Sequence, residues 1–409
     1  MKASNSLKSC IAYIALIQFY NLQGLLGLGS AGRILAIAII AFSLYKAINV
    51  ITCYKSDAFI RTINCLLIVF TLYGIYYMAF GPQYIVTQFH SYGIISKFDY
   101  LKNIYLSILP FYVIYGYAQK GIFNPRVLLG LALFIIGCSI VSFFAFYTGI
   151  DTSNSVNVTD GITNNNGYKF VALIPLLYLT NKWRIPLMIL CMVFIILSLK
   201  RGAILIGTIS FILGLICIFK QAKGFKRFWL VFLIGVIIFT GCYAVSSFYE
   251  ENAGFQRRVE DTIAGNTSGR EDLVGYLWNH FRDNASIVDQ LFGNGADSTV
   301  GIAGNYAHND WLEILTNQGV FGVLLFALLF INWFMMWKRF KRICPRNVYY
   351  ALGVALLVFF LKSIFSMAYT SFGVTTSIIV AYCYYIAQSK GYMRQNNHYA
   401  SNRLHLRLR

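Results

Sequence analysis

The sequence predicts an all-α polytopic membrane protein, with about 12 transmembrane helices and one large, partly helical loop on the exported side of the membrane. Hydrophobic residues make up 58% of the 409 residues and charged residues only 12%. Apolar runs of about 20 residues, the length that an α-helix needs to cross a bilayer, recur from one end of the chain to the other. A polar stretch late in the chain interrupts them and predicts the loop.

Each predicted span is an apolar run with few charges, although Gln18, Asn21 and Gln23 interrupt the first and the sixth is short. The spans cover residues 10–28, 34–54, 60–80, 101–118, 127–149, 168–180, 185–199, 202–219, 228–248, 319–337, 349–369 and 372–387. This division places nine spans in residues 1–248, the exported loop in residues 249–318, three spans in residues 319–387 and a basic cytoplasmic tail in residues 388–409.

The net charge of +19 follows the topology. With both ends in the cytoplasm, most Lys and Arg residues lie in cytoplasmic loops, and Asp57 is the only acidic residue on that side. This is the positive-inside pattern, and it predicts anionic membrane lipids as partners of those loops. Because the basic residues are scattered over short loops rather than gathered on one folded face, nucleic acid binding is not expected.

The remaining composition favours neither a disulfide framework nor a metal site. The nine cysteines lie in spans or, for Cys344, in a cytoplasmic loop, and the exported loops contain none. Histidines are not spaced for one helix face, the acidic residues form no compact cluster, and no glycine-rich nucleotide-binding loop is present. We therefore expect no metal and no cofactor.

The exported loop is too long for a simple connector and is predicted to fold. Leu273, Leu277 and Phe281 recur at helical spacing together with Trp278, which predicts a helix lying against the membrane surface. Four glycines follow, and they predict a flexible stretch that leads to the only histidine near the next span; they are Gly293, Gly295, Gly301 and Gly304.

That histidine, His308, precedes a short predicted helix. Asp310 and Glu313, three residues apart, resemble a capping box at its start, and Gly319 is a C-cap candidate at its end. The partial positive charge of a helix N-terminus disfavours the imidazolium form, and a neutral imidazole is what a general base needs. The alternative is a loop histidine that only hydrogen-bonds a neighbour.

Several cationic residues on the exported side run against the charge bias, and they include Lys200, Arg201, Arg257, Arg258, Arg270 and Arg282. Guanidinium groups bind phosphate oxygens in a bidentate manner, so converging arginines can hold a pyrophosphate without a metal ion. The alternatives are snorkelling for Arg201 and surface salt bridges for the arginines of the loop. Lys362 lies in an apolar span near its outer end, where a functional role and snorkelling are equally good explanations.

Four short motifs together resemble the O-antigen ligase and polymerase superfamily of bacterial envelopes. They are Arg201 and Gly202 at the outer end of a span; Ser268, Gly269 and Arg270 followed by Trp278; Gly293, Asn294 and Gly295; and His308 and Asn309 followed by Gly319 and Gly322. The likeness is strongest over residues 195–335.

The resemblance implies an inverting, metal-independent glycosyltransferase of the GT-C-like kind in the bacterial inner membrane, with its active site facing the periplasm. It implies a glycan on undecaprenyl pyrophosphate as donor, a glycan as acceptor, and a chain-length regulator protein as a further partner. His308 would deprotonate the acceptor hydroxyl, while Arg201 and Arg270 would hold the departing pyrophosphate. Arg258 matches a further basic position of the family, although the adjacent Arg257 matches it equally.

Three functions are compatible with this layout. A polymerase passes the growing glycan to another lipid-linked repeat of the O-antigen or capsule, and a ligase passes the finished chain to lipid A core or, in some relatives, to protein. We favour the polymerase, because nothing in the exported loop indicates a separate surface for a protein acceptor. A transporter or flippase of lipid-linked sugars would place ionisable groups near the bilayer midplane, often in repeated halves, and this chain shows neither feature.

Overall fold

The computed structural model describes residues 2–54, 56–86, 93–148, 163–180, 183–265, 270–369 and 372–389. Most of residues 151–167, a polar segment after the fifth predicted span that we expect to be a flexible exported linker, and nearly all of the predicted basic tail lie outside these ranges. Ser268 and Gly269 of the arginine motif lie outside them as well.

The described chain is almost entirely helical. The long helices are α1 (Lys2–Asn21), α2 (Gly29–Cys53), α3 (Ala58–Phe80), α4 (Lys97–Ala118), α5 (Pro125–Thr148), α8 (Arg201–Gln221), α9 (Phe225–Glu251), α14 (Asp310–Phe340), α15 (Arg346–Phe365) and a last helix over residues 373–389. The shorter ones are α6 (Gly167–Leu177), α7 (Arg184–Leu197), α10 (Ala253–Ile263), α11 (Arg270–Asn279), α12 (Ile287–Phe292) and α13 (Ser298–Ala303), with one π-helical turn at His280–Asn284. Strands β1 (Ile85–Val86) and β2 (Gly93–Ile94) pair antiparallel between α3 and α4.

Seven helices are long and apolar enough to cross a membrane, namely α2, α3, α5, α8, α9, α14 and α15, and α6 and α7 are apolar but shorter. The predicted all-α polytopic membrane fold is therefore confirmed. A helix also lies at each of the other predicted spans. The number of twelve crossings stays a prediction, because only seven helices meet the criteria of length and composition.

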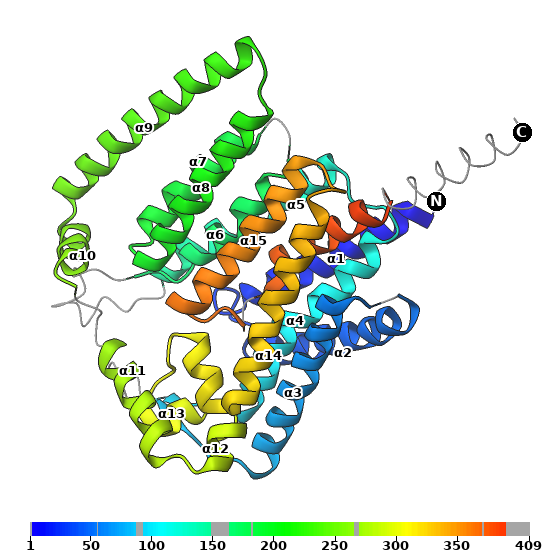
Figure 1. Cartoon of the computed structure of the whole chain (residues 1–409), viewed down its shortest axis with the longest axis vertical. Coiled ribbons are helices and arrows are strands. Elements are labelled where there is room, and N and C mark those ends of the chain that lie inside the picture. The colour runs from blue at the N-terminus through cyan, green and yellow to red at the C-terminus, as the bar shows by residue number, and fades with distance from the viewer. Residues whose placement is uncertain are drawn as a thin grey trace, which may run out of the picture.

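The long helices form one bundle (Figure 1). Helix α4 packs against α2 and α3, α14 packs against α3 and α15, and α15 continues the contact to α6 and α8. Trp333 of α14 is fully buried between Phe59 of α3 and Phe372, at ring-centroid distances of 5.4 and 5.7 Å. Helix α9 stands at the side of the bundle, contacts α8 and α10, and exposes Phe228, Phe232 and Phe239, as a lipid-facing helix does.

Helices α11 to α13 and the first turns of α14 gather at one end of the bundle, the lower end in Figure 1. We call this end the loop end. The position of α11 against the membrane surface stays a prediction, and Trp278 is exposed. Leu273 and Leu277, however, are buried against Ala307 and Leu312 inside the protein. This packing holds α11 directly against the segment that carries His308.

Helix α14 is two helices separated by a break at Gly319, which has non-helical backbone angles (φ 68°, ψ −166°). The short first helix therefore ends where the sequence predicted. Gly319 and Gly293 bring two backbones into contact: a Cβ on Gly319 would lie 2.5 Å from the carbonyl group of Leu291, and a Cβ on Gly293 would clash with the backbone of Asn317. Both glycines also have positive φ, so no other residue fits at either position without strain.

The motif Gly293, Asn294 and Gly295 caps this break. The carbonyl of Thr316 accepts a hydrogen bond from the backbone N–H of Asn294 at 2.9 Å, and that of Asn317 accepts one from Gly295 at 3.0 Å. These carbonyls lie at the end of a helix, where intrahelical partners are missing. The predicted flexible glycine stretch is thus wrong, since the glycines belong to a structured connection that contains α12 and α13.

Candidate functional site

His308 lies at the loop end in the turn just before α14, with its backbone in the left-handed region (φ 52°). The helix begins with a cap that the sequence analysis misidentified. Asn309 is the N-cap residue, and its side-chain oxygen accepts hydrogen bonds from the backbone N–H groups of Trp311 at 2.9 Å and Leu312 at 3.1 Å. The predicted capping box of Asp310 and Glu313 is wrong, because both carboxylates point into the protein and bind elsewhere.

The Asp310 carboxylate is fully buried and accepts hydrogen bonds from the backbone N–H groups of Ala368 at 2.8 Å and Tyr369 at 2.9 Å. It fastens the start of α14 to the segment that follows α15. Buried carboxylates need such donors, because desolvation without them is costly.

The Glu313 carboxylate is also fully buried and binds on the other side of the histidine. It accepts from the backbone N–H of Ala307 at 2.8 Å, from the Thr299 hydroxyl at 2.6 Å and from the Asn317 amide at 3.0 Å. Ala307, directly before His308, is therefore held by the Glu313 carboxylate, and Asp310, two residues after it, is anchored by its own buried carboxylate.

The C-terminal end of α15 binds two other segments of the site. Its last carbonyls have no intrahelical partner. The carbonyl of Ile364 accepts a hydrogen bond from the Asn309 amide at 3.1 Å, and that of Phe365 accepts one from the Arg270 guanidinium at 2.9 Å. Arg270, the first residue of α11, and the His308 turn are thus anchored at consecutive carbonyls of the same helix.

Arg201 begins α8 at the same place. A Cβ on the next residue, Gly202, would clash with the Tyr168 hydroxyl and lie 3.3 Å from the Phe365 Cβ, so the first turn of α8 packs tightly against α6 and the end of α15. The structure therefore brings together the first turn of α8, the start of α11 and His308, which together span more than a hundred residues of the chain.

The other predicted arginines are not placed in this group. Arg258 belongs to α10, but its side chain lies outside the described residues, and the neighbouring Arg257 is exposed. Arg282 is exposed and pairs with Asp283 at 2.7 Å, which agrees with the alternative of a surface ion pair.

The electrostatics of the site favour a neutral histidine. Burial of His308, followed by the nearby charges of Arg270 and Lys200, lowers its pKa from 6.5 to about 4. The direction is the one that the sequence predicted, although the causes are burial and two cations rather than the helix N-terminus. At neutral pH the imidazole is uncharged and able to accept a proton.

His308 lines a cavity of about 530 Å³ that Lys169, Lys200 and Lys362 also line, together with Tyr168. The Lys362 ammonium lies 5.2 Å from the centre of the Tyr168 ring. Lys362 therefore faces the cavity. No Asp or Glu is found among the described residues that line this cavity.

Sequence reasoning did not identify Tyr168 or Lys169 as part of the site. Lys169 carried the same signal that singled out Lys362, a basic residue within an apolar segment. Tyr168 carried no signal, because its role depends on the packing of α6 against α8 and α15.

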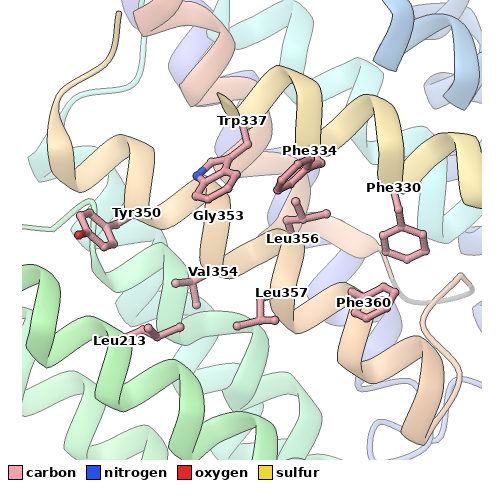
Figure 2. A pocket seen from close by; sticks show the side chains of 10 residues that line it. All are labelled: Leu213, Phe330, Phe334, Trp337, Tyr350, Gly353, Val354, Leu356, Leu357 and Phe360. Atoms are coloured by element: carbon pink, nitrogen blue, oxygen red, sulfur yellow. The ribbon is translucent and has the colours of Figure 1, made fainter. Parts of the chain in front are cut away.

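A second, wholly apolar pocket of about 440 Å³ lies between α8, α14 and α15. Figure 2 shows side chains from the three helices around it, among them Leu213, Phe330, Trp337 and Phe360. Its lining offers no group for chemistry. Two of the helices that line it, α14 and α15, also carry parts of the site. Trp311, three residues after His308, stacks on Phe330 at 5.6 Å and contacts Phe360 at 6.4 Å, so this pocket begins beside the His308 turn.

Fold and site together define a multi-pass helical membrane protein with a neutral histidine and several cations at one end of the bundle. Residues 186–327, which contain Arg201, Arg270 and His308, match the family model described as O-antigen ligase. This match confirms the predicted resemblance to the O-antigen ligase and polymerase superfamily, and it indicates a membrane enzyme of the ligase or polymerase type. No curated protein matches the chain significantly.

Proposed function

We propose that the protein transfers a glycan from undecaprenyl pyrophosphate to a hydroxyl of an acceptor sugar, at the periplasmic face of the bacterial inner membrane, and that it polymerises O-antigen or capsular repeat units. The observation that carries this proposal is the half-buried, neutral His308 beside Arg270 and Lys200, in a cavity with no carboxylate among its described lining residues. A base for a hydroxyl and a set of cations for a pyrophosphate are the two elements that the reaction needs.

In the proposed reaction, His308 accepts the proton of the acceptor hydroxyl while the hydroxyl oxygen attacks the anomeric carbon of the donor. The bond between that carbon and the pyrophosphate oxygen breaks, and the configuration inverts. Arg201 and Arg270 stabilise the charge on the departing pyrophosphate, and Lys200 and Lys362 add to the positive potential. General-base assistance contributes on the order of 10² to 10⁴ in rate, and electrostatic stabilisation of the leaving group contributes at least as much.

The apolar pocket of Figure 2 supports a lipid-linked donor. It extends along α14 from Phe330 to Trp337, roughly 10 Å at the helical rise of 1.5 Å per residue, and its first residues contact Trp311 next to the His308 turn. A polyprenyl chain in this pocket would stay in contact with the bilayer while its pyrophosphate reaches the cations at the loop end.

Purified protein and lipid-linked repeats test the reaction directly. The resemblance leads us to expect elongation in the presence of a chelator and without nucleotide. A strict requirement for added divalent metal would contradict the metal-independent mechanism.

A gel of cell-surface glycans separates polymerase from ligase. Loss of a polymerase leaves single repeats attached to the outer lipid, whereas loss of a ligase leaves long chains on the carrier lipid. Loss of a flippase would instead leave repeats on the inner face. We expect the polymerase pattern, and the chain-length regulator remains a proposed partner that would change the length of the chains.

A further inference from the structure

The cavity that contains His308 continues into the bundle between α1, α4, α5 and α6. The residues of α15 that line it run from Lys362 to Ala355, which corresponds to roughly 10 Å along the helix axis. We call this part the amide arm, and define it by the side chains of Gln18, Asn21, Asn103, Asn165 and Thr376, with Lys169 beside them.

The amides of the arm have no hydrogen-bond partner among the residues that the structure describes. Gln18 is only 8% exposed, yet it binds no protein group there. The residues just before α6 provide a contrast: the Asn164 amide donates to the carbonyl of Phe143 and the Asn166 amide to that of Ser142, both at 3.1 Å, whereas the exposed Asn165 between them lines the cavity without such a bond.

The buried, unpaired amide of Gln18 indicates a ligand, and the exposed side chains of Asn21, Asn103 and Asn165 line the same cavity. Buried polar groups are normally hydrogen-bonded, and polar residues inside membrane helices mark the paths of substrates. An amide both donates and accepts hydrogen bonds, which suits hydroxyl groups in either role. The absence of carboxylates among the described lining residues argues against a cation as the ligand.

The arm and the apolar pocket lie on different faces of α15. Gly353, Leu357 and Phe360 face the apolar pocket, whereas Ala355, Phe359 and Lys362 face the cavity that contains the arm. Both spaces reach the C-terminal end of α15, where the His308 turn is anchored. A lipid tail on one face and a second substrate on the other would therefore meet at the histidine.

We propose that the amide arm binds a sugar unit of the acceptor glycan and directs its attacking hydroxyl toward His308. This inference rests on the proposed function for the identity of the acceptor, but the binding of sugar to the arm is measurable without any reaction.

The experiment is saturation-transfer NMR with the purified full-length protein and a lipid-free oligosaccharide repeat released by mild acid from the cell's own lipid-linked repeats. We expect transfer to the sugar protons with the unmodified protein, and about a tenfold weaker affinity for Gln18→Leu, Asn103→Leu and Asn165→Leu. Asn49→Leu is the matched control, because Asn49 is exposed on α2 and does not line the cavity. It should bind the oligosaccharide with unchanged affinity.

A second variant covers the case in which the leucine variants do not fold. Ala172→Phe adds bulk to the lining of the cavity on α6 and removes no polar group. It should elute as a single species in size-exclusion chromatography and bind the oligosaccharide at least tenfold more weakly.

The two proposals fail in distinguishable ways. Unchanged affinity in Ala172→Phe and in the folded leucine variants would overturn the sugar site, whatever the enzyme activity. If the unmodified protein binds the oligosaccharide, the arm variants bind it more weakly, and no glycan is transferred, the sugar site would be supported and the proposed reaction rejected. His308→Asn should bind the oligosaccharide normally, since the histidine acts in the reaction and the amides hold the sugar.

Discussion

The left-handed backbone of His308 determines which substitution tests its role most cleanly. Asparagine adopts positive φ more readily than most residues, whereas alanine at this position adds roughly 1 to 2 kcal/mol of strain. We predict that His308→Asn retains normal expression but lowers the rate of glycan elongation by about 10² to 10⁴, the usual contribution of a general base. Initial rates at matched protein levels measure the effect, and a variant that elongates chains at the normal rate would show that His308 is not the base.

The low pKa of His308 predicts an unusual pH profile. The base is active when neutral, so kcat/KM should fall with acid only as the pH approaches about 4, and not near the ordinary value of 6.5. Arg270 is one of the causes of the low value, because its positive charge disfavours the imidazolium form. Arg270→Gln should therefore move the acidic limb upward toward 6.5, whereas Arg270→Lys, which keeps the charge, should leave it low.

Rates measured from pH 4 to 8, with activity recovered on return to pH 7, establish this profile. An acidic limb near 6.5 in the unmodified protein would contradict the environment that we assign to His308.

At the scale of residues, the sequence predicted His308, Arg201 and Arg270 as site residues. Each lies in one of the short motifs, and the two arginines place positive charge on the exported side, where the positive-inside pattern disfavours it. It did not predict which neighbours would surround them. Tyr168 and Lys169 come from a helix more than a hundred residues away from His308, and only the packing of α6 against α15 brings them to the cavity.

At the scale of elements, the start of α14 is held by two buried carboxylates. Asp310 and Glu313 carried a helix-start signal in the sequence, yet their spacing serves to fix the turn on both sides through Ala368 and Ala307. Sequence reasoning failed here because the donors to Asp310, Ala368 and Tyr369, lie 58 and 59 residues further along the chain. The cap itself comes from Asn309, one residue earlier.

We expect Glu313→Gln to act through the position of His308. The amide keeps the size of the carboxylate but weakens its charge-assisted hydrogen bonds to Ala307 and Thr299, so the histidine turn becomes less well placed. The expected result is a kcat reduced about tenfold with a nearly unchanged KM for the lipid-linked donor. Equal changes in both constants, or none in either, would contradict a positioning role.

The contact between Gly293 and Gly319 predicts a strong effect on stability. Alanine at either position would meet opposing backbone and adopt a disfavoured φ, so Gly293→Ala and Gly319→Ala should each destabilise the protein by more than about 1 kcal/mol. Gly137→Ala in α5 is the control, because a Cβ there meets nothing within 4 Å and helical alanine is favoured over glycine. Thermal unfolding in detergent compares the three variants, and a midpoint of Gly319→Ala as high as that of the control would refute the close contact.

At the scale of the whole molecule, hydrophobic run lengths predicted a helix at every span, because the bilayer imposes a length that composition reveals. The same patterns did not predict how α11 to α13 pack, because the apolar side of a short helix can be buried against any nearby apolar surface. Leu273 and Leu277 are buried against Ala307 and Leu312 of the same protein.

The length of α14 predicts which parts of the molecule lie on opposite sides of the membrane. From Gly319 to Phe340 the helix extends roughly 32 Å, enough to cross the hydrocarbon core of about 30 Å, so we expect the segments before Gly319 and after Phe340 on opposite sides of the membrane. Val288 on α12 and Lys341 after α14 are both exposed. In whole cells with a permeabilised outer membrane, a membrane-impermeant thiol reagent should label Val288→Cys at once and Lys341→Cys only after the inner membrane is opened. The unsubstituted protein measures the background of the native cysteines. The reverse pattern would place His308 on the cytoplasmic side and reject a periplasmic reaction.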